Sequence, residues 1–498
     1  MTESTVNVAE WIQNRVRKDE ITRYMRNGKT FINDEEIFDL LQDTRQPDTK
    51  EVKDIIAKSL TISTLEPRET ALLLKVTDPD LLENMFTAAA EVKRKVYDNR
   101  IVTFAPLYTG NMCVNNCRYC GFRTENKSVN RHILTEDEIK RETEVLVGKI
   151  GHKRLIVVYG EHPRTDIDYM VDSIKAVYSV QIRKNDHLSN IRRVNVNAAP
   201  LSIDALKRLK EVGIGTYQVF QETYHRPTYE YYHPQGTLKG NYLWRLYCMH
   251  RALDAGIDDV GIGALFGLYD WKYEVMALLY HSRELESLYN VGPHTISFPR
   301  LEPAFNTPVS EKSDHPISSQ EFKRLVAVLR LSVPHCGLIL TARENARTRR
   351  EIIPLGCTQT DASTKIGIGA YSLAENKEEK DREQFVIGDS RSLDEVVREL
   401  AKMGYITSFC TAGYRCGRTG ETIMELLKCG KEGVFCKLNA IITYREWLDD
   451  FASPETKEIG EELIQKEIAQ VKETMPELYD ELIQYYERTR KGERDLYF

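Results

Sequence analysis

Three cysteines lie close together in the segment Cys113-Val-Asn-Asn-Cys117-Arg-Tyr-Cys120. Thiolates are the usual protein ligands of iron–sulfur clusters. Three of them can hold a [4Fe-4S] cluster by three irons and leave the fourth iron open to a small molecule. A zinc site would need a fourth Cys or His ligand nearby, and the nearest histidine, His132, follows twelve residues later. A chance group of buried thiols is the remaining alternative, but the compact spacing favours the cluster.

The C-x3-C-x2-C spacing resembles the cluster motif of the radical S-adenosylmethionine (SAM) superfamily, and the aromatic Tyr119 before the third cysteine also fits it. In that superfamily the amino and carboxylate groups of SAM chelate the open iron, and one electron from the cluster cleaves SAM to a 5'-deoxyadenosyl radical. The resemblance implies two cofactors, a [4Fe-4S] cluster and SAM. It also implies a one-electron donor such as ferredoxin or flavodoxin.

Composition narrows the class of protein. The chain has 498 residues, a net charge of −6 and ten cysteines. No Lys/Arg block dominates, so the electrostatic pattern of a nucleic-acid binder is missing. No long apolar run and no apolar leader segment occur, which speaks against membrane insertion or secretion. We expect a cytoplasmic enzyme that acts on a small molecule, in a reducing compartment where clustered cysteines bind metal.

Short apolar runs alternate with amphipathic helical stretches from residue 101 onward. Eight such runs, each followed by a helix or loop, predict a parallel (β/α)8 barrel, with a doubly wound open sheet as the alternative. The predicted strands are 101–108, 155–159, 194–198, 216–220, 260–265, 295–298, 338–341 and 357–360. Chemistry in such a barrel lies at the carboxyl ends of the strands, and the cysteine segment directly follows the first of them.

The flanking regions have a different pattern. We expect a helical N-terminal extension (1–98), a barrel (99–375) and a mostly helical C-terminal domain (376–498). A long helix should begin at Asp78-Pro79, and capping boxes predict helix starts at Thr135 and Ser318. The charged stretch 375–383 predicts an exposed loop. The C-terminal domain contains a cysteine-bearing segment at 410–436 and a polar helical tail from 455 to about 490.

Three longer segments carry a more specific resemblance. They are Gly215-Thr-Tyr-Gln-Val-Phe-Gln-Glu-Thr-Tyr-His225, Asp258-Asp-Val-Gly-Ile-Gly-Ala-Leu-Phe-Gly-Leu268 and Val291-Gly-Pro-His-Thr-Ile-Ser-Phe-Pro-Arg300. With them the chain resembles, over nearly its whole length, the HydG family of [FeFe]-hydrogenase maturation, kin to the thiazole-biosynthesis tyrosine lyase ThiH. The resemblance implies cleavage of the Cα–Cβ bond of L-tyrosine to p-cresol and dehydroglycine. In the HydG family a second cluster converts dehydroglycine to CO and cyanide.

That second cluster is ligated in the family by a C-x2-C-x22-C motif, and this chain departs from it. Cys410 and Cys436 keep the outer positions, but Gly413 replaces the middle cysteine. Glycine offers no ligand atom. Two alternatives follow: a HydG paralogue without the auxiliary cluster, acting on tyrosine or another amino acid, or an altered iron–sulfur cluster held by Cys410, Cys416 and Cys436.

The resemblance also assigns candidate SAM-binding residues. Gly160 and Glu161 match the element whose backbone and carboxylate receive the amino group of SAM, against the alternative of an ordinary loop. Other candidates for contacts with SAM, each weighed against a structural role, are Asn195 and Asn197 on one face of a strand, Gly261, Gly263 and Gly267 near the adenine, and Arg300 near the SAM carboxylate or ribose.

Four residues are candidates for binding tyrosine or moving its protons. Arg343 aligns with an arginine that seats an amino-acid carboxylate, which a bidentate guanidinium suits. His294, Tyr224 and His225 are candidates for the tyrosine phenol, although such residues more often pack or cap. From a different class, the chain could be a catalytically inactive cluster protein that serves as a scaffold in a maturation complex. Reductive cleavage of SAM would separate this alternative from the enzyme.

Overall fold

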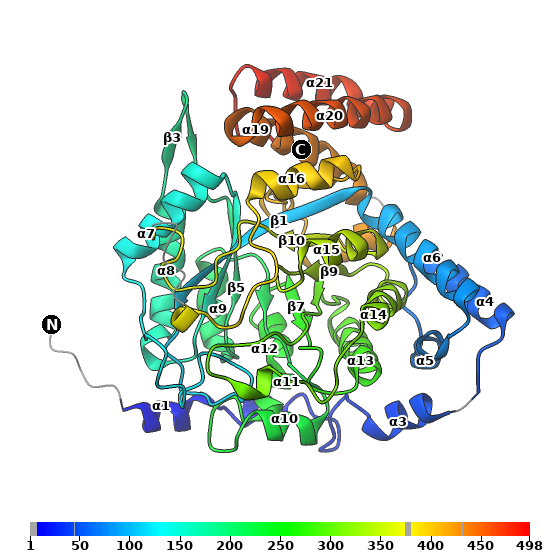
Figure 1. The fold of residues 1–498 in the computed structure, drawn as a ribbon, viewed down its shortest axis with the longest axis vertical. Helices are drawn as coiled ribbons and strands as arrows, with labels where there is room; N and C mark the ends of the chain where they lie inside the picture. Colours follow the sequence, from blue (N-terminus) through cyan, green and yellow to red (C-terminus); the bar gives the residue numbers. More distant parts are fainter. Residues whose placement is uncertain (1–6, 44, 374–379, 430–431) are drawn as a thin grey trace.

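A closed barrel of parallel strands forms the centre of the computed structural model, which describes residues 7–43, 45–373, 380–429 and 432–498 (Figure 1). The barrel strands are β1 (Arg100–Gly110), β2 (Arg154–Tyr159), β5 (Arg193–Asn197), β6 (Tyr217–Gln218), β7 (Val260–Gly263), β8 (Thr295–Ser297), β9 (Gly337–Leu340) and β10 (Gln359–Asp361). They pair in chain order, and β10 closes on β1. The predicted (β/α)8 barrel is confirmed, and the open sheet is excluded because the sheet has no gap between β10 and β1.

Burial explains why these runs form barrel strands. All residues of β1 are buried, as expected for a parallel strand covered on both faces. Its later half pairs with β2, with Ala105 opposite Leu155, and its earlier half pairs with β10, with Val102 opposite Gln359. A small apolar cluster of Phe104, Ile156 and Ile339 joins three of the strands.

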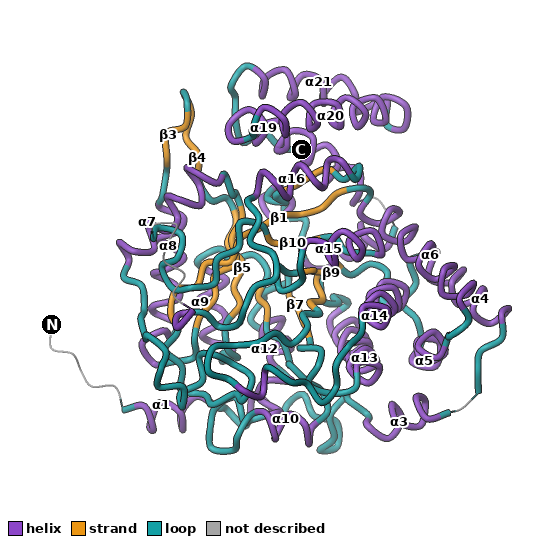
Figure 2. The backbone as a smooth tube through the Cα atoms, viewed as in Figure 1, coloured by secondary structure: helices purple, strands orange, loops and turns teal. Residues whose placement is uncertain are grey.

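Helices surround the strands, as Figure 2 shows by colour. They are α7 (Glu136–Val145), α8 (Ile167–Ser179), α9 (Ile203–Glu211), α10 (Arg226–Tyr232), α11 (Tyr242–Leu246), α12 (Cys248–Asp254), α13 (Trp271–Tyr289), α14 (Ser319–Ser332) and α15 (Ala346–Ile352). The predicted capping boxes are confirmed. The backbone N–H of Glu138 donates to the Thr135 hydroxyl, and that of Glu321 donates to the Ser318 hydroxyl, while each Glu carboxylate accepts from the cap backbone.

The N-terminal residues form helices that lie along the outside of the barrel (Figure 1). They are α1 (Val8–Arg15), α2 (Asp19–Thr22), α3 (Asp34–Gln42), α4 (Thr49–Leu60), α5 (Pro67–Lys75) and α6 (Pro79–Tyr97). α1 lies near α8, and α4 to α6 lie on the side of α13 and α14. α6 begins as predicted, because the Asp78 carboxylate accepts from the N–H groups of Asp80 and Leu81. α6 packs on α14, and α3 and α5 pack on α13. These helices therefore extend the helical layer of the barrel.

The C-terminal region packs against the amino end of the barrel. It contains α16 (Leu393–Lys402), β11 (Ile406–Ser408), α17 (Ala412–Arg415), α18 (Gly420–Lys428), α19 (Glu432–Phe451), α20 (Pro454–Thr474) and α21 (Pro476–Arg490). β11 pairs in parallel with the start of β1, with Ile406 opposite Arg100. The two cysteine-bearing regions thus lie at opposite ends of β1. Both the predicted boundary at 375 and 376 and the charged segment 375–379 lie outside the described residues.

Two short strand features have no counterpart in the sequence prediction. One is β11, and the other is the antiparallel hairpin of β3 (Ile182–Lys184) and β4 (His187–Ser189). The hairpin reaches the C-terminal helices, where His187 Nε2 lies 2.9 Å from the Asp450 carboxylate.

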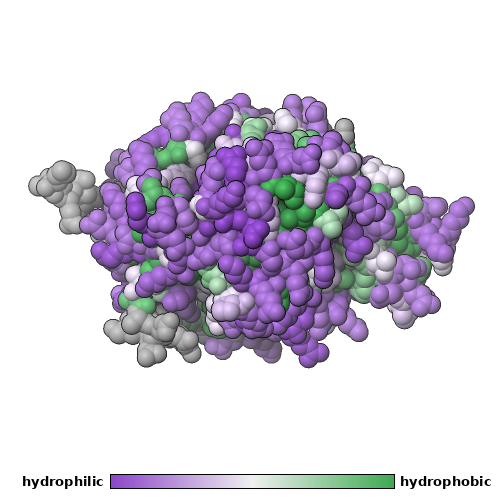
Figure 3. All heavy atoms as spheres, turned by 90° about the horizontal axis from the view of Figure 1, so that it is seen from above, coloured by the Kyte–Doolittle hydropathy of each residue, from purple (hydrophilic) through white to green (hydrophobic). Residues whose placement is uncertain are grey.

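The surface is mainly hydrophilic on the face that carries the C-terminal helices. Figure 3 shows that face with a few small apolar areas among polar and charged side chains. Within the described ranges, no helix is long and apolar enough to cross a membrane.

Candidate active site

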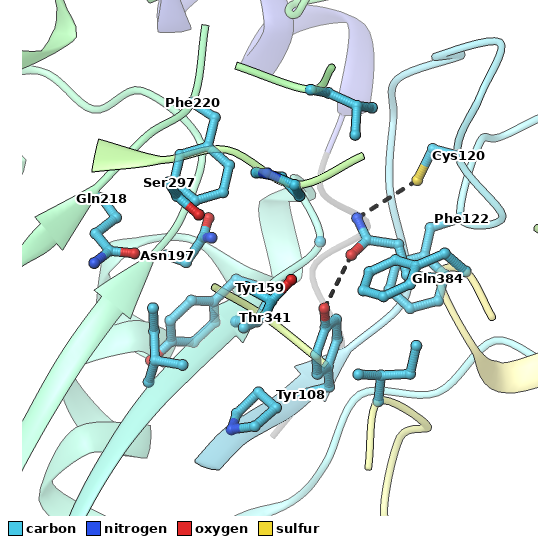
Figure 4. Close-up of a pocket in the computed structure, with 18 of the residues that line it drawn as sticks. Tyr108, Cys120, Phe122, Tyr159, Asn197, Gln218, Phe220, Ser297, Thr341 and Gln384 are labelled. Carbon is cyan, nitrogen blue, oxygen red and sulfur yellow. Dashed lines mark hydrogen bonds between the residues drawn. The ribbon is translucent and has the colours of Figure 1, made fainter. Parts of the chain in front are cut away.

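A cavity of about 210 Å³ opens at the carboxyl ends of the barrel strands. Its lining includes residues at or just after all eight barrel strands: Tyr108, the cysteine segment, Gly160, Glu161, Asn197, Phe220, Glu222, Leu265, Ser297, Arg343 and Asp361. Figure 4 shows Tyr108, Tyr159, Asn197 and Ser297 among the side chains around it. The barrel geometry predicts this position for the chemistry, because the carboxyl ends of all the strands meet there.

Cys113, Cys117 and Cys120 all line this cavity. Burial raises the pKa of Cys113 and raises the pKa of Cys117 to about 12. Since iron binds the thiolate, loading of a cluster must release these protons. Side-chain amides donate to two of the sulfurs: Asn115 Nδ2 lies 3.7 Å from Cys113 Sγ, and Gln384 Nε2 lies 3.6 Å from Cys120 Sγ.

Gly160 and Glu161 stand beside the cysteine segment, as the sequence predicts. A Cβ on Gly160 would lie 2.3 Å from the Met112 carbonyl oxygen, so only glycine permits the close approach. The Glu161 carboxylate accepts from Asn115 Nδ2 at 2.5 Å. Burial raises the pKa of Glu161, and the neighbouring cations, Arg15 first, oppose that shift. The carboxylate is thus placed where a ligand cation can meet it.

Arg343 brings a cation into the same cavity. Its guanidinium carbon lies 3.3 Å from the centroid of the Phe385 ring. It makes no hydrogen bond or ion pair with any residue in the part of the chain that the structure describes. Burial lowers the pKa of Arg343. Because a partly buried charge that faces a cavity without an ionic partner is costly, this guanidinium is suited to receive an anionic ligand.

The residues fit a [4Fe-4S] cluster with SAM better than a mononuclear metal ion. Within the described ranges, no group of three or more His, Cys, Asp or Glu side chains is arranged to hold a metal ion. Three thiolates on a cubane each bind a different iron, so they need not converge on one point. The thiols, the Glu161 carboxylate and the unpaired Arg343 share one cavity, which matches that cofactor pair.

Comparison with known proteins agrees with this geometry. A family model described as "Radical SAM superfamily" matches residues 107–279, and one described as "Biotin and Thiamin Synthesis associated domain" matches residues 297–406. The 2-iminoacetate synthase of Salmonella typhimurium is 31% identical over 70% of this chain and 88% of its own length. A crystal structure of HydG, a maturase of the [FeFe]-hydrogenase, is 47% identical with a TM-score of 0.88, over 94% of this chain and 100% of that chain. The chain belongs to the HydG and 2-iminoacetate synthase family of radical SAM enzymes.

A second HydG structure, from Carboxydothermus hydrogenoformans, is 35% identical with a TM-score of 0.75, over 95% of this chain and 99% of that chain. The likeness therefore includes the N-terminal helices and the C-terminal region as well as the barrel. The [4Fe-4S] cluster and SAM follow from membership of the radical SAM superfamily.

Several cavity residues of this HydG-family protein were not predicted. Glu222 has a positive φ of 71° and lies 2.7 Å from Lys239 Nζ and 3.3 Å from an Arg245 nitrogen. Lys239 and Arg245 lower its pKa against the opposing effect of burial. Glu222 lies within the segment 215–225 that carries the resemblance, and that was the available signal. Lys239 and Arg245 follow in the next loop and helix without any local pattern.

Other candidates for SAM contacts lie outside the cavity lining. Arg300 forms a bidentate ion pair with Glu344, in which Arg300 Nε lies 2.7 Å from Glu344 Oε1. The Asn195 amide oxygen accepts from the Thr216 backbone N–H at 3.0 Å. A Cβ on Gly261 or Gly263 would approach the Gln218 side chain or the Ser297 carbonyl to within 2.7 Å. The roles of these residues toward SAM stay predictions. Asn197 and Tyr119 do line the cavity.

The three candidates for the phenol also lie away from the cavity lining. Tyr224 is buried, with its hydroxyl 2.7 Å from His281 Nδ1. His225 stacks on Tyr269 at 3.8 Å between ring centroids. His294 precedes β8, so it lies at the amino end of the barrel, where its Nδ1 is 2.8 Å from Asp259.

A second, smaller cavity of about 30 Å³ lies at that amino end. His294, Cys410, Gly413 and Cys436 line it. Cys416 does not; it is exposed, and its Sγ lies 3.6 Å from the Phe498 carbonyl oxygen. Two thiols therefore face this cavity where the family motif supplies three. The residues present do not fit a cluster held by three thiolates.

Proposed function

We propose that this protein is a radical SAM lyase that cleaves the Cα–Cβ bond of L-tyrosine to p-cresol and dehydroglycine. One observation carries the proposal: the three cysteines, the Glu161 carboxylate and the unpaired Arg343 guanidinium line the same cavity. The relative from Salmonella typhimurium is named for 2-iminoacetate, which is dehydroglycine. A scaffold protein would not need a substrate cavity that joins a cluster site to a free cation.

Different residues bind SAM and the substrate. A bound [4Fe-4S] cluster and SAM supply the 5'-deoxyadenosyl radical. Glu161, oriented by Asn115, receives the cationic amino group of SAM. Arg343 binds the tyrosine carboxylate through two parallel hydrogen bonds, which orients the substrate amino group toward the cavity. Phe385, which stacks on Arg343, and Phe220 and Leu265 of the lining shield the cavity from water.

The reaction can be tested with anaerobically reconstituted protein, SAM, dithionite and tyrosine. We expect 5'-deoxyadenosine and p-cresol in about equal amounts, because one hydrogen abstraction leads to one bond cleavage. A panel of other amino acids separates tyrosine from related substrates. Cleavage of SAM without any p-cresol would reject tyrosine as the substrate, and absence of SAM cleavage would favour the scaffold.

Replacement of Arg343 by methionine should raise KM for tyrosine by about 10- to 100-fold, because hydrogen bonds to a charged partner contribute about 1.5–3 kcal/mol. Slow cleavage of SAM without tyrosine should be unchanged. Arg347→Met is the matched control, since Arg347 is 86% exposed and its one ion pair among the described residues is with Glu351. Equal KM values in the two variants would contradict the assignment of Arg343.

We further propose that dehydroglycine is released without conversion to CO and cyanide, because this chain lacks the auxiliary cluster of the HydG family. Gly413 stands between Cys410 and Cys436 at the second cavity, and Cys416 lies elsewhere. Wild-type protein should carry about four irons per chain, and Cys410→Ala should not change that number. A loss of about four irons in Cys410→Ala would contradict the proposal.

A further inference from the structure

Gln384 reaches the cluster site from far along the chain. It lies 264 residues after Cys120, in the segment between β10 and α16, and its side chain lines the cavity. Gln384 Nε2 lies 3.6 Å from Cys120 Sγ, and Gln384 Oε1 accepts from the Tyr108 hydroxyl at 3.0 Å. Figure 4 shows the amide between the tyrosine and the cysteine, with both interactions drawn.

The backbone fixes Gln384 against the cysteine segment. The Gly121 N–H donates to the Gln384 carbonyl oxygen at 3.0 Å. A Cβ on Gly121 would lie 2.8 Å from the Glu383 carbonyl and 2.9 Å from that of Gln384. The two segments therefore touch at a residue that has to be glycine. This contact sets the distance between the Gln384 side chain and the sulfur.

The direction of the amide is also determined. Burial raises the pKa of Tyr108 well above its usual range, so the side chain remains a phenol with a proton to donate. Its hydroxyl occupies the acceptor end of the Gln384 amide, and the NH₂ end then faces Cys120. A thiolate that ligates iron has no proton and can only accept. Donor and acceptor thus match at each of the two contacts.

We propose that Gln384, oriented by Tyr108, donates an N–H···S hydrogen bond to the cluster ligand Cys120 and thereby raises the reduction potential of the cluster. Reduction adds negative charge to the iron–sulfur core and its thiolates, and a hydrogen bond to a ligating sulfur stabilises that charge. Gln384 acts on the cluster through Cys120 and stabilises its reduced state, so we class it as a positioning residue. The inference rests on the cluster of the proposed function and does not depend on tyrosine as the substrate.

The test is an anaerobic redox titration of the reconstituted protein followed by EPR, with SAM and tyrosine left out. Gln384→Met keeps the length of the side chain and removes the donor. At the wild-type midpoint potential, the ratio of reduced to oxidised cluster should fall at least threefold, where a tenfold fall corresponds to 59 mV for a one-electron couple. Tyr108→Phe should shift the ratio in the same direction by less, because the amide is retained and only its orientation is freed.

Glu125→Gln is the control for charge near the cluster, because Glu125 lies five residues after Cys120, is exposed, and is screened by solvent. Its midpoint should equal that of the wild type. Full iron content with an unshifted midpoint in Gln384→Met overturns the proposal, even if SAM cleavage is slower, since that result indicates a structural role. If Gln384→Met does not load iron, Tyr108→Phe decides, and an unshifted midpoint there overturns the proposal. Failure to cleave tyrosine would leave this measurement unaffected.

Discussion

Replacement of Cys117 by alanine will lower the iron content from about four atoms per chain to near zero and reduce the formation of 5'-deoxyadenosine and p-cresol to background. In the part of the chain that the structure describes, three thiols line the cavity, so each is needed. A cluster held by two thiolates exposes a second iron to water and loss. Iron and sulfide analysis together with EPR of the anaerobic protein measures the first effect, and product analysis measures the second.

Cys248→Ala is the matched control, because Cys248 is also a buried cysteine and therefore loses the same side-chain volume. Cys248 lies in α12, with its Sγ 3.7 Å from the Tyr217 hydroxyl and away from the cavity. We expect a small loss of stability there with full iron content. Retention of iron and SAM cleavage in Cys117→Ala would refute the cluster assignment, and with it the proposed chemistry.

Replacement of Gly413 by cysteine should raise the iron content from about four to about eight atoms per chain. Gly413 faces the second cavity with Cys410 and Cys436, and a new Cβ there would meet nothing nearer than the Arg418 carbonyl oxygen at 3.7 Å. Gly413 lies in the short helix α17 and has no positive φ, so an L-residue fits its backbone. The new thiolate would complete the C-x2-C-x22-C motif.

Gly413→Ser controls for side-chain size, since a hydroxyl is a poor ligand for an iron–sulfur cluster. This variant should keep about four irons per chain. The double variant Gly413→Cys with Cys410→Ala should also stay there. Iron analysis and the EPR spectrum of the dithionite-reduced protein follow the change. An unchanged iron content in Gly413→Cys would show that more than one missing thiolate separates this site from a cluster site.

The barrel could be predicted from the sequence because its strands are buried on both faces and its helices begin at recognisable caps, such as Thr135 and Ser318. The place of the chemistry followed from the fold, which brings the residues after β1 and β2 together at one end. The local motifs Cys113 to Cys120 and Gly160-Glu161 therefore meet in space as predicted.

Contacts between distant segments could not be predicted. Gln384 and Phe385 enter the cavity from a segment whose local pattern gives no sign of it, and Lys239 comes from a loop after β6. Spacing along the chain also does not predict where a side chain points. Cys416 lies close to Cys410 in sequence, but its sulfur faces Phe498. Arg300 follows a strand as predicted, yet Glu344 engages its guanidinium.

The length of β1 has a consequence for how this enzyme can change. Its 11 residues begin beside the second cavity and end at the cysteine segment, and at about 3.3 Å per residue they separate the two regions by roughly 35 Å. Substitutions that far apart act independently. A change of ligands at one end of the barrel, such as Gly413 in the second cavity, therefore leaves the cysteine segment at the other end undisturbed.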